Sequence, residues 1–208
     1  DRTIREEEYY WIWQGRTGLS LYHPASEQIS FASDFPNDTG KYHIIKCIEK
    51  CRTQPGIWAA SGNACVVHLQ HESMKMKCIQ EIRIPDACQV RVLHEDDQGN
   101  LWIGTENAIY QYSISDGNMR RIHKDTGAIN GIAISPDKAI YYITETPEFS
   151  CLPPDGQVHS IHKGENYSSI IISPDNKIWT ATLEGNVYSY HPQLQTLARE
   201  DNACNANG

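Results

Sequence analysis

Residues Asp97-Gln98-Gly99-Asn100-Leu101-Trp102-Ile103-Gly104-Thr105 decide the fold, because they hold a turn and a short strand that recur along the chain. At the centre of this stretch an aliphatic residue precedes an aromatic one. The same kind of pair returns at Ile12-Trp13, Ile57-Trp58, Ile140-Tyr141 and Ile178-Trp179. Successive pairs are 45, 44, 39 and 38 residues apart. A period of about 40 residues built from strand-like units is typical of a β-propeller, in which each repeat forms one four-stranded blade.

Each repeat holds short apolar segments separated by turns rich in Asp, Asn, Gly and Pro. We therefore expect an all-β propeller of four-stranded blades, with five repeats visible. No segment has a helical period. The expected strands, repeat by repeat, are 10–13, 19–22 and 28–31; 42–48, 57–60, 65–69 and 78–82; 89–93, 101–104, 108–112 and 119–122; 129–135 and 140–143; 169–173, 178–182 and 187–190.

The first repeat is shorter than the others. It begins near its second strand, at Tyr10–Trp13, and has no clear inner strand. Two architectures fit this pattern: a six-bladed propeller with one blade missing, or a ring of five blades. We expect one propeller domain over residues 1–199, followed by a polar C-terminal tail over residues 200–208 that frays.

Composition argues against two classes of partner. Acidic residues outnumber basic ones by 26 to 18, which gives a net charge of −8, and Lys and Arg form no cluster. A surface that follows a phosphate backbone needs such a cluster, so we expect no nucleic-acid partner. No apolar run reaches the roughly 20 residues of a membrane span, so we expect none.

Seven cysteines occur without a CxxC pair or the spacing of a zinc ribbon. This pattern favours buried or free thiols in a reducing compartment. We therefore expect a cytoplasmic location, with a periplasmic or secreted protein as the alternative.

Three stretches resemble the SMP-30/gluconolactonase/luciferin-regenerating family of six-bladed propellers. Residues 10–26 resemble the YWVD strand and YDPxTG turn of its first blade, and residues 97–105 resemble its DxxGxxWxGT segment. Residues 130–142 resemble its NGLxxSPDxxxxYY segment, the most specific of the three. The resemblance runs from about Tyr10 to Leu197. A weaker one links residues 97–112 to the propeller repeats of two-component sensors.

The resemblance implies where a metal site would lie. In the family, a Glu near the start, an Asn, the Asn of NGL and a catalytic Asp bind one divalent cation at the mouth of the central tunnel. The Glu aligns upstream of Asp1, the first Asn aligns with Arg91, the NGL Asn with Asn130, and the Asp with Ser168. Only Asn130 is kept as a metal ligand. A guanidinium has no lone pair to give a metal, and a serine hydroxyl is a weak ligand.

These substitutions set the functional prediction. We expect a propeller with a degenerate metal centre whose tunnel mouth, with Arg91, Asn130 and Ser168, binds a small polar or anionic ligand or a protein partner. No catalytic residue is assigned. A first alternative is a divalent-metal-dependent sugar lactonase or ester hydrolase, in which a register change recruits Asp86 or Asp125. A second is the sensor propeller of an exported receptor. The resemblance implies at most one cofactor, a divalent cation such as calcium, manganese or zinc.

Other conspicuous residues favour structural roles. His68 and His71, like His159 and His162, are three residues apart, which places them on opposite faces of a strand rather than together on a metal. We expect these histidines to be exposed or to cap turns, and residues 145–148 to form an exposed acidic loop. The recurring tryptophans are expected to pack between blades.

Overall fold

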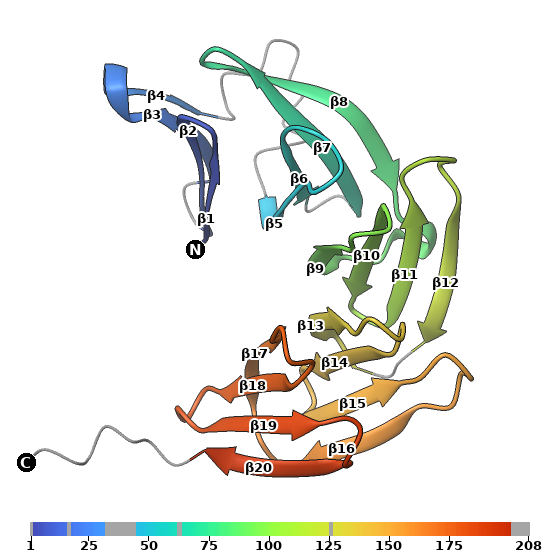
Figure 1. The fold of residues 1–208 in the computed structure, drawn as a ribbon. Helices are drawn as coiled ribbons and strands as arrows, with labels where there is room; N and C mark the ends of the chain where they lie inside the picture. Colours follow the sequence, from blue (N-terminus) through green and yellow to red (C-terminus); the bar gives the residue numbers. More distant parts are fainter. Residues whose placement is uncertain (1, 16–17, 32–44, 62–63, 125–126, 201–208) are drawn as a thin grey trace, which may run out of the picture. The chain divides into compact units, whose positions relative to one another are not determined.

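The protein consists of short antiparallel sheets arranged in two compact units, Asp1–Asp125 and Thr126–Gly208 (Figure 1). The computed structural model describes residues 2–15, 18–31, 45–61, 64–124 and 127–200. Five four-stranded sheets lie within these ranges, and in each the strands pair in chain order. We call these sheets blades 1 to 5. They confirm the prediction of an all-β chain with one four-stranded blade per repeat.

The first unit holds blades 1 to 3. Two single turns of 3₁₀ helix, Pro24–Ser26 and Pro85–Ala87, lie in its connections. Its strands are β1 (Arg2–Glu6), β2 (Tyr9–Gln14), β3 (Gly18–His23) and β4 (Gln28–Phe31); β5 (Ile45–Lys50), β6 (Ile57–Ser61), β7 (Cys65–Glu72) and β8 (Lys75–Arg83); β9 (Val90–Glu95), β10 (Asn100–Thr105), β11 (Ala108–Ser113) and β12 (Met119–Lys124).

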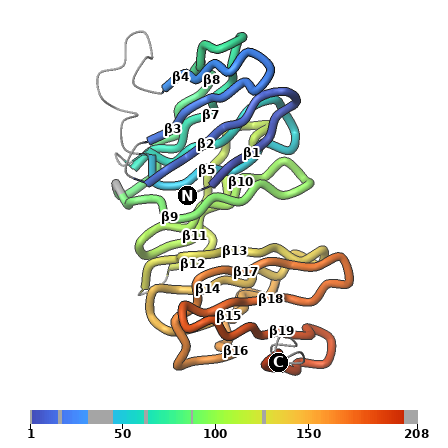
Figure 2. The backbone as a smooth tube through the Cα atoms, turned by 90° about the vertical axis from the view of Figure 1, so that its left-hand side faces the viewer, coloured from blue at the N-terminus to red at the C-terminus, as the bar shows by residue number. Residues whose placement is uncertain are grey.

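The second unit holds blades 4 and 5. Their first strands, β13 and β17, lie side by side, as the two views show (Figure 1, Figure 2). The strands are β13 (Ile129–Ile134), β14 (Ile140–Thr144), β15 (Glu148–Leu152) and β16 (His159–Lys163); β17 (Tyr167–Ile172), β18 (Ile178–Thr182), β19 (Val187–His191) and β20 (Thr196–Glu200).

Blade 1 corrects the expectation that the first repeat lacks its inner strand. Arg2–Glu6 forms β1, which pairs with β2 along its whole length, from Arg2 opposite Trp13 to Glu6 opposite Tyr9. The strand escaped notice because Ile4 is its one apolar residue, and Ile4 is buried. Blade 1 is therefore as complete as the others.

Several strand limits also differ from those expected. β15, β16 and β20 were not among the expected strands. Polar and charged residues predominate in β16 and β20, and β15 is a short, almost wholly buried strand without alternation. β7 and β8 are longer than expected, and residues 42–44 of the expected strand 42–48 lie outside the described residues. The proposed boundary between a propeller domain and a tail at residues 199/200 stays a prediction.

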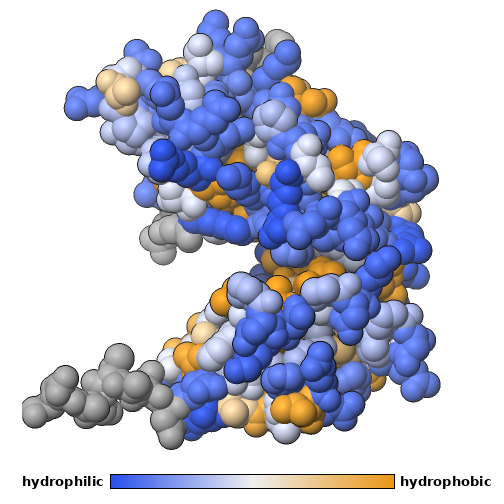
Figure 3. All heavy atoms as spheres, in the orientation of Figure 1, coloured by the Kyte–Doolittle hydropathy of each residue, from blue (hydrophilic) through white to orange (hydrophobic). Residues whose placement is uncertain are grey.

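Apolar side chains fill the spaces between facing blades. One cluster, which includes Trp11 and Ile48, joins blades 1 and 2; a second, which includes Trp58 and Leu101, joins blades 2 and 3. A third, centred on Phe149, joins blades 4 and 5. Most residues on the face drawn in Figure 3 are hydrophilic. No helix among the described residues has the length and apolar character needed to cross a membrane.

Candidate functional site

A β-bulge lies near the start of the first strand in blades 2 to 5. In blade 2, Ile45 pairs with Ser61 and Cys47 with Ala60, so Lys46 is an extra residue between two paired ones. The same irregularity occurs in β9, β13 and β17. The four extra residues are Lys46, Arg91, Asn130 and Ser168, and all four are exposed. A bulge leaves its extra residue out of the ladder and redirects its side chain, and such bulges are common beside functional sites.

We call Lys46, Arg91, Asn130 and Ser168 the bulge row, because they are equivalent in register from blade to blade. The bulge row contains all three residues predicted to bind a ligand. Arg91, Asn130 and Ser168 occupy the same register position in three consecutive blades. The sequence prediction reached Arg91 and Ser168 by counting back from the tryptophan of each repeat, and Asn130 by its match to the NGL segment. Sequence reasoning missed Lys46. The signal that could have found it is an apolar residue followed by a polar one at the start of the first strand, as in Ile45-Lys46 and Val90-Arg91.

Within each unit, the bulge residues lie on first strands that pack beside one another. In the first unit, β5 packs beside β9, and the Cys47 thiol lies against the backbone of Leu93, which brings the bulges of Lys46 and Arg91 next to each other. In the second unit, β13 packs beside β17, and these strands carry Asn130 and Ser168. The Ser168 hydroxyl donates to the carbonyl of Ala181 at 3.2 Å. The joining of Arg91 with Asn130 and Ser168 in one site stays a prediction.

The donors of the row do not suit a divalent cation. Calcium, magnesium and manganese prefer carboxylate and carbonyl oxygens, and two of the four positions carry Lys46 and Arg91, which repel a cation. Asn130 alone offers an amide oxygen, and the Ser168 hydroxyl is a weak neutral ligand. Among the described residues, no group of three or more His, Cys, Asp and Glu side chains is arranged to hold a metal.

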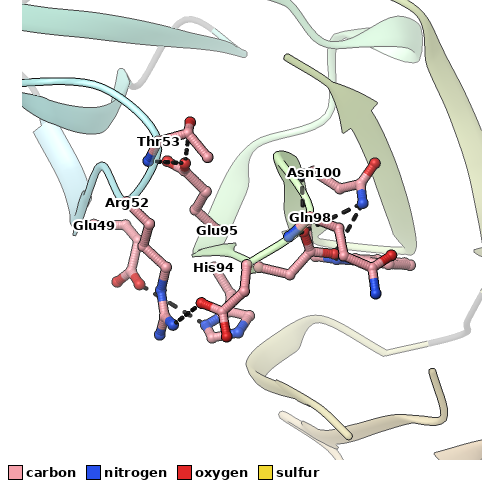
Figure 4. A network of polar contacts seen from close by, with 10 residues as sticks. Glu49, Arg52, Thr53, His94, Glu95, Gln98 and Asn100 are labelled. Atoms are coloured by element: carbon pink, nitrogen blue, oxygen red, sulfur yellow. Dashed lines mark hydrogen bonds and ion pairs between the residues drawn. The ribbon is translucent and has the colours of Figure 1, made fainter. Parts of the chain in front are cut away.

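A second polar group lies three residues further along the first strands. Arg2, Glu49 and His94 are each paired with the aromatic residue of the next strand: Trp13, Trp58 and Trp102. They therefore occupy one register position in blades 1, 2 and 3. Arg2 Nη2 lies 2.6 Å from Glu49 Oε2. His94 Nδ1 lies 3.8 Å from Glu49 Oε1 (Figure 4).

The surroundings of this group shift its two titratable members in opposite directions. Burial raises the pKa of Glu49 above 4.5, and the Arg2 guanidinium partly offsets this effect. Burial lowers the pKa of His94 below 6.5, and the nearby Arg52 guanidinium lowers it further. The imidazole is therefore neutral at neutral pH. Arg52 itself pairs with the exposed Asp97 at 2.7 Å.

Two further carboxylates of the first strands have structural roles. Glu95 is fully buried and accepts hydrogen bonds from the backbone and hydroxyl of Thr53, at 2.9 and 2.6 Å (Figure 4). It also accepts one from the Trp58 indole at 2.6 Å. Glu6 accepts from the Trp11 indole at 2.7 Å and from the backbone N–H of Gly56. The loop 51–56 of blade 2 is thus held from both sides, by blade 1 and by blade 3.

The remaining sequence candidates are dispersed. His68 and His71 have different partners, so they form no metal pair: His68 bonds to the Pro55 carbonyl and His71 to that of Ser73. His68 is buried rather than exposed, and its bond to the Pro55 carbonyl caps the loop 51–56, which is the other role expected of it. Its ring lies near that of Trp58.

The second histidine pair is also separate, because His159 is exposed while His162 bonds to the Tyr167 hydroxyl. Asp86 contacts Arg121 at 3.4 Å, and Asp125 lies outside the described residues. Residues 145–147 form an exposed bend, as expected, but Glu148 begins β15 and is partly buried.

The tryptophans largely confirm their predicted place in the core. Trp58 and Trp102 are buried, and Tyr141 takes the equivalent place in blade 4. Trp13 and Trp179 are partly exposed. Trp13 donates to the Ile45 carbonyl at 2.9 Å and so joins blade 1 to blade 2.

The repeated four-stranded blades and the bulge row define a β-propeller. A family model described as the SMP-30/gluconolactonase/LRE-like region matches residues 47–203. The chain belongs to this family. Among curated proteins, no sequence match was found.

Solved structures support the same fold. The extracellular domain of a putative hybrid two-component system from B. thetaiotaomicron superposes with a TM-score of 0.71 at 18% identity, over 97% of this chain and 27% of that one. Luciferin-regenerating enzyme gives 0.67 at 15% identity, over 93% of this chain and 71% of that one. A structure of the nidogen/laminin complex gives 0.68 at 10% identity, over 94% and 74%. The chain thus spans about a quarter of the sensor domain.

Proposed function

We propose that this propeller has lost the metal centre of its family and binds a small polar or anionic ligand at the bulge row. The observation that carries the proposal is the chemistry of the four equivalent positions: two cations, one amide and one hydroxyl. Such a set can donate hydrogen bonds to an anion, whereas it lacks the carboxylates that a divalent cation prefers.

No catalytic residue is assigned in this proposal. Arg91 would supply charge and a planar pair of N–H donors, and the Asn130 amide would supply a shorter-range hydrogen bond. The Ser168 hydroxyl would accept a hydrogen bond from the ligand, or would exchange its bond to the Ala181 carbonyl for one to the ligand. The Asn130 amide can both donate and accept, so it also suits a neutral polar group. A protein partner that presents a carboxylate to the row would use the same donors.

A calorimetric titration of metal-stripped protein with calcium, manganese and zinc tests the loss of the metal centre. We expect no binding at one equivalent for any of the three. Binding near one equivalent that Asn130→Ala abolishes would contradict the proposal and favour the metal-dependent lactonase. Ser168→Ala is the matched control, since removing a weak ligand should leave a true metal site largely intact.

A thermal-unfolding measurement with citrate and gluconate tests the ligand half of the proposal. A ligand that binds the folded chain raises the midpoint of unfolding. We expect Arg91→Gln to remove most of this shift. An equal shift in the unaltered chain and in Arg91→Gln would show that these anions bind elsewhere.

The sensor propeller is the alternative with a specific observation in its favour, because extracellular domains of putative sensor systems superpose on this chain. The superposition supports a shared fold, and an identity of 17–18% is too low to support a shared role. The cytoplasmic location stays a prediction.

A further inference from the structure

On the first strands of the first unit, the basic side chains are exposed and the acidic ones are largely buried. β1, β5 and β9 carry five Lys and Arg residues, and all five are exposed. The same strands carry three glutamates, and each is buried or nearly so. The exposed basic residues are Arg2, Arg5, Lys46, Lys50 and Arg91. The glutamates are Glu6, Glu49 and Glu95. A chain with a net charge of −8 thus presents cations along these strands.

The three glutamates are engaged within the protein. Glu95 and Glu6 accept the hydrogen bonds that hold the loop 51–56, and Glu49 pairs with Arg2. Glu49 offsets the charge of Arg2, one of the five cations, whereas Glu6 and Glu95 accept hydrogen bonds from the loop 51–56 and from Trp11 and Trp58. An anion that approaches these strands therefore meets mainly positive charge.

The two bulges place two of these cations side by side. Lys46 and Arg91 are the extra residues of adjacent strands, and the thiol next to Lys46 lies against the backbone of Leu93, two residues from Arg91. Facing sheets pack about 10 Å apart, so the ends of these two long side chains can contact the same small anion.

We infer that Lys46 and Arg91 form a binding site for a phosphoryl group, and that the ligand of this chain is a small phosphorylated molecule. The inference rests on the proposed function, because it places the ligand at the bulge row. A guanidinium binds phosphate oxygens in pairs, and an ammonium adds a compact charge without a fixed geometry. A phosphate monoester carries a charge of about −2 at neutral pH, so each cation attracts it about twice as strongly as a carboxylate.

Calorimetry with inorganic phosphate, repeated with acetate, tests the inference on the full chain. The variants are Arg91→Gln and Lys46→Gln, which remove one charge each. Lys50→Gln is the matched control: it removes an exposed cation from the same strand but from outside the bulge. Circular dichroism confirms that each variant is folded.

We expect phosphate to bind near one equivalent and more tightly than acetate. Loss of one charge-assisted hydrogen-bonding partner should weaken phosphate binding about tenfold or more in Arg91→Gln and several-fold in Lys46→Gln. Lys50→Gln should bind phosphate as the unaltered chain does.

Three results would overturn the phosphoryl site. Equal weakening in Lys50→Gln would show a diffuse charge effect. Acetate binding as tight as phosphate binding, and dependent on Arg91, would leave the anion-binding function standing but without preference for phosphate. Absence of phosphate binding would also overturn it, whereas failure of the proposed function would be seen separately, as metal binding through Asn130.

Discussion

Asp96 shows how much of the fold depends on single polar residues in the turns between strands. Its carboxylate accepts hydrogen bonds from the backbone N–H groups of Gln98 and Asn100, both at 2.9 Å, and from the Trp102 indole at 2.8 Å. The Asn100 side chain adds a fourth donor. The acid thereby fixes the turn of blade 3 and orients a core tryptophan at the same time.

We predict that Asp96→Ala lowers the free energy of unfolding by about 2–3 kcal/mol, because one buried indole N–H and a set of turn N–H groups lose their acceptor. Urea unfolding at pH 7 measures the loss. Asp97→Ala is the matched control: Asp97 is exposed and holds only a surface ion pair with Arg52, so its loss should be under about 0.5 kcal/mol. Equal losses in the two variants would contradict the role given to Asp96.

The sequence reveals some residues of the candidate site but not others. Arg91, Asn130 and Ser168 could be found because each lies at a constant distance before the aromatic residue of its repeat. Glu49 could not be found in this way. Its burial between Arg2 and His94 depends on three strands that are far apart in the sequence, and nothing local distinguishes it from an exposed glutamate.

At the scale of elements, close packing between adjacent blades limits what the first strands can carry. Gly131 follows the bulge residue Asn130 in β13, where a Cβ atom would lie 2.7 Å from Ile170 Cγ2 and 2.9 Å from Ile143 Cγ1. The glycine therefore permits β13 and β17 to approach. The motif that contains it was recognised from the sequence, but its reason is the packing of the next blade.

We predict that Gly131→Ala destabilises the fold by about 1–3 kcal/mol, the usual effect of overpacking a core. The midpoint of thermal unfolding should fall accordingly. Gly15→Ala serves as the comparison, because its nearest atom, Trp13 Cζ2, would lie 3.9 Å away at an ordinary contact distance. If both variants unfold at the same temperature, then β13 has more freedom to move than the contacts indicate.

Elements were predicted well where apolar and polar residues alternate and poorly where they do not. β18 (Ile178–Thr182) has the predicted limits, because an aliphatic–aromatic pair and a turn mark it clearly. β1 and β20 were missed because charged residues occupy their exposed positions, and the neighbouring strand alone defines the pairing.

At the scale of the whole molecule, carboxyl groups with opposite shifts determine how stability depends on pH. Burial alone would raise the pKa of Asp96, but hydrogen bonds from Trp102, Asn100 and Gln98 outweigh it and hold the pKa below 3.8. Its contribution to stability is therefore complete above pH 3.8 and is lost as the pH falls through the lower, folded-state value. Glu49 has a raised pKa, so its contribution has the opposite sign and declines as the pH rises above 4.5.

We predict that the unaltered chain loses stability as the pH falls below 3.8, because Asp96 takes up a proton more readily in the unfolded chain than in the folded one. Glu49→Gln should keep this loss. Above pH 4.5, Glu49→Gln should remove the decline that the buried carboxylate causes, at the expense of the pair with the half-exposed Arg2. Urea unfolding of both proteins across the acid and neutral range measures the difference. Parallel profiles would show that Glu49 has the same pKa in the folded and unfolded chain.

The loop 51–56 makes blade 2 a poor candidate for exchange with another repeat. Glu6 of blade 1 and Glu95 of blade 3 both need its backbone N–H groups, and the left-handed Gly56 lets the loop pass against the Leu69 carbonyl. A copy of any other blade inserted at this place would remove the Thr53 and Trp58 donors of Glu95 and would leave Glu6 with the Trp11 indole alone. Although the sheets of blades 1 to 3 are alike, these blades are not interchangeable, because the polar contacts at their junctions fix their order.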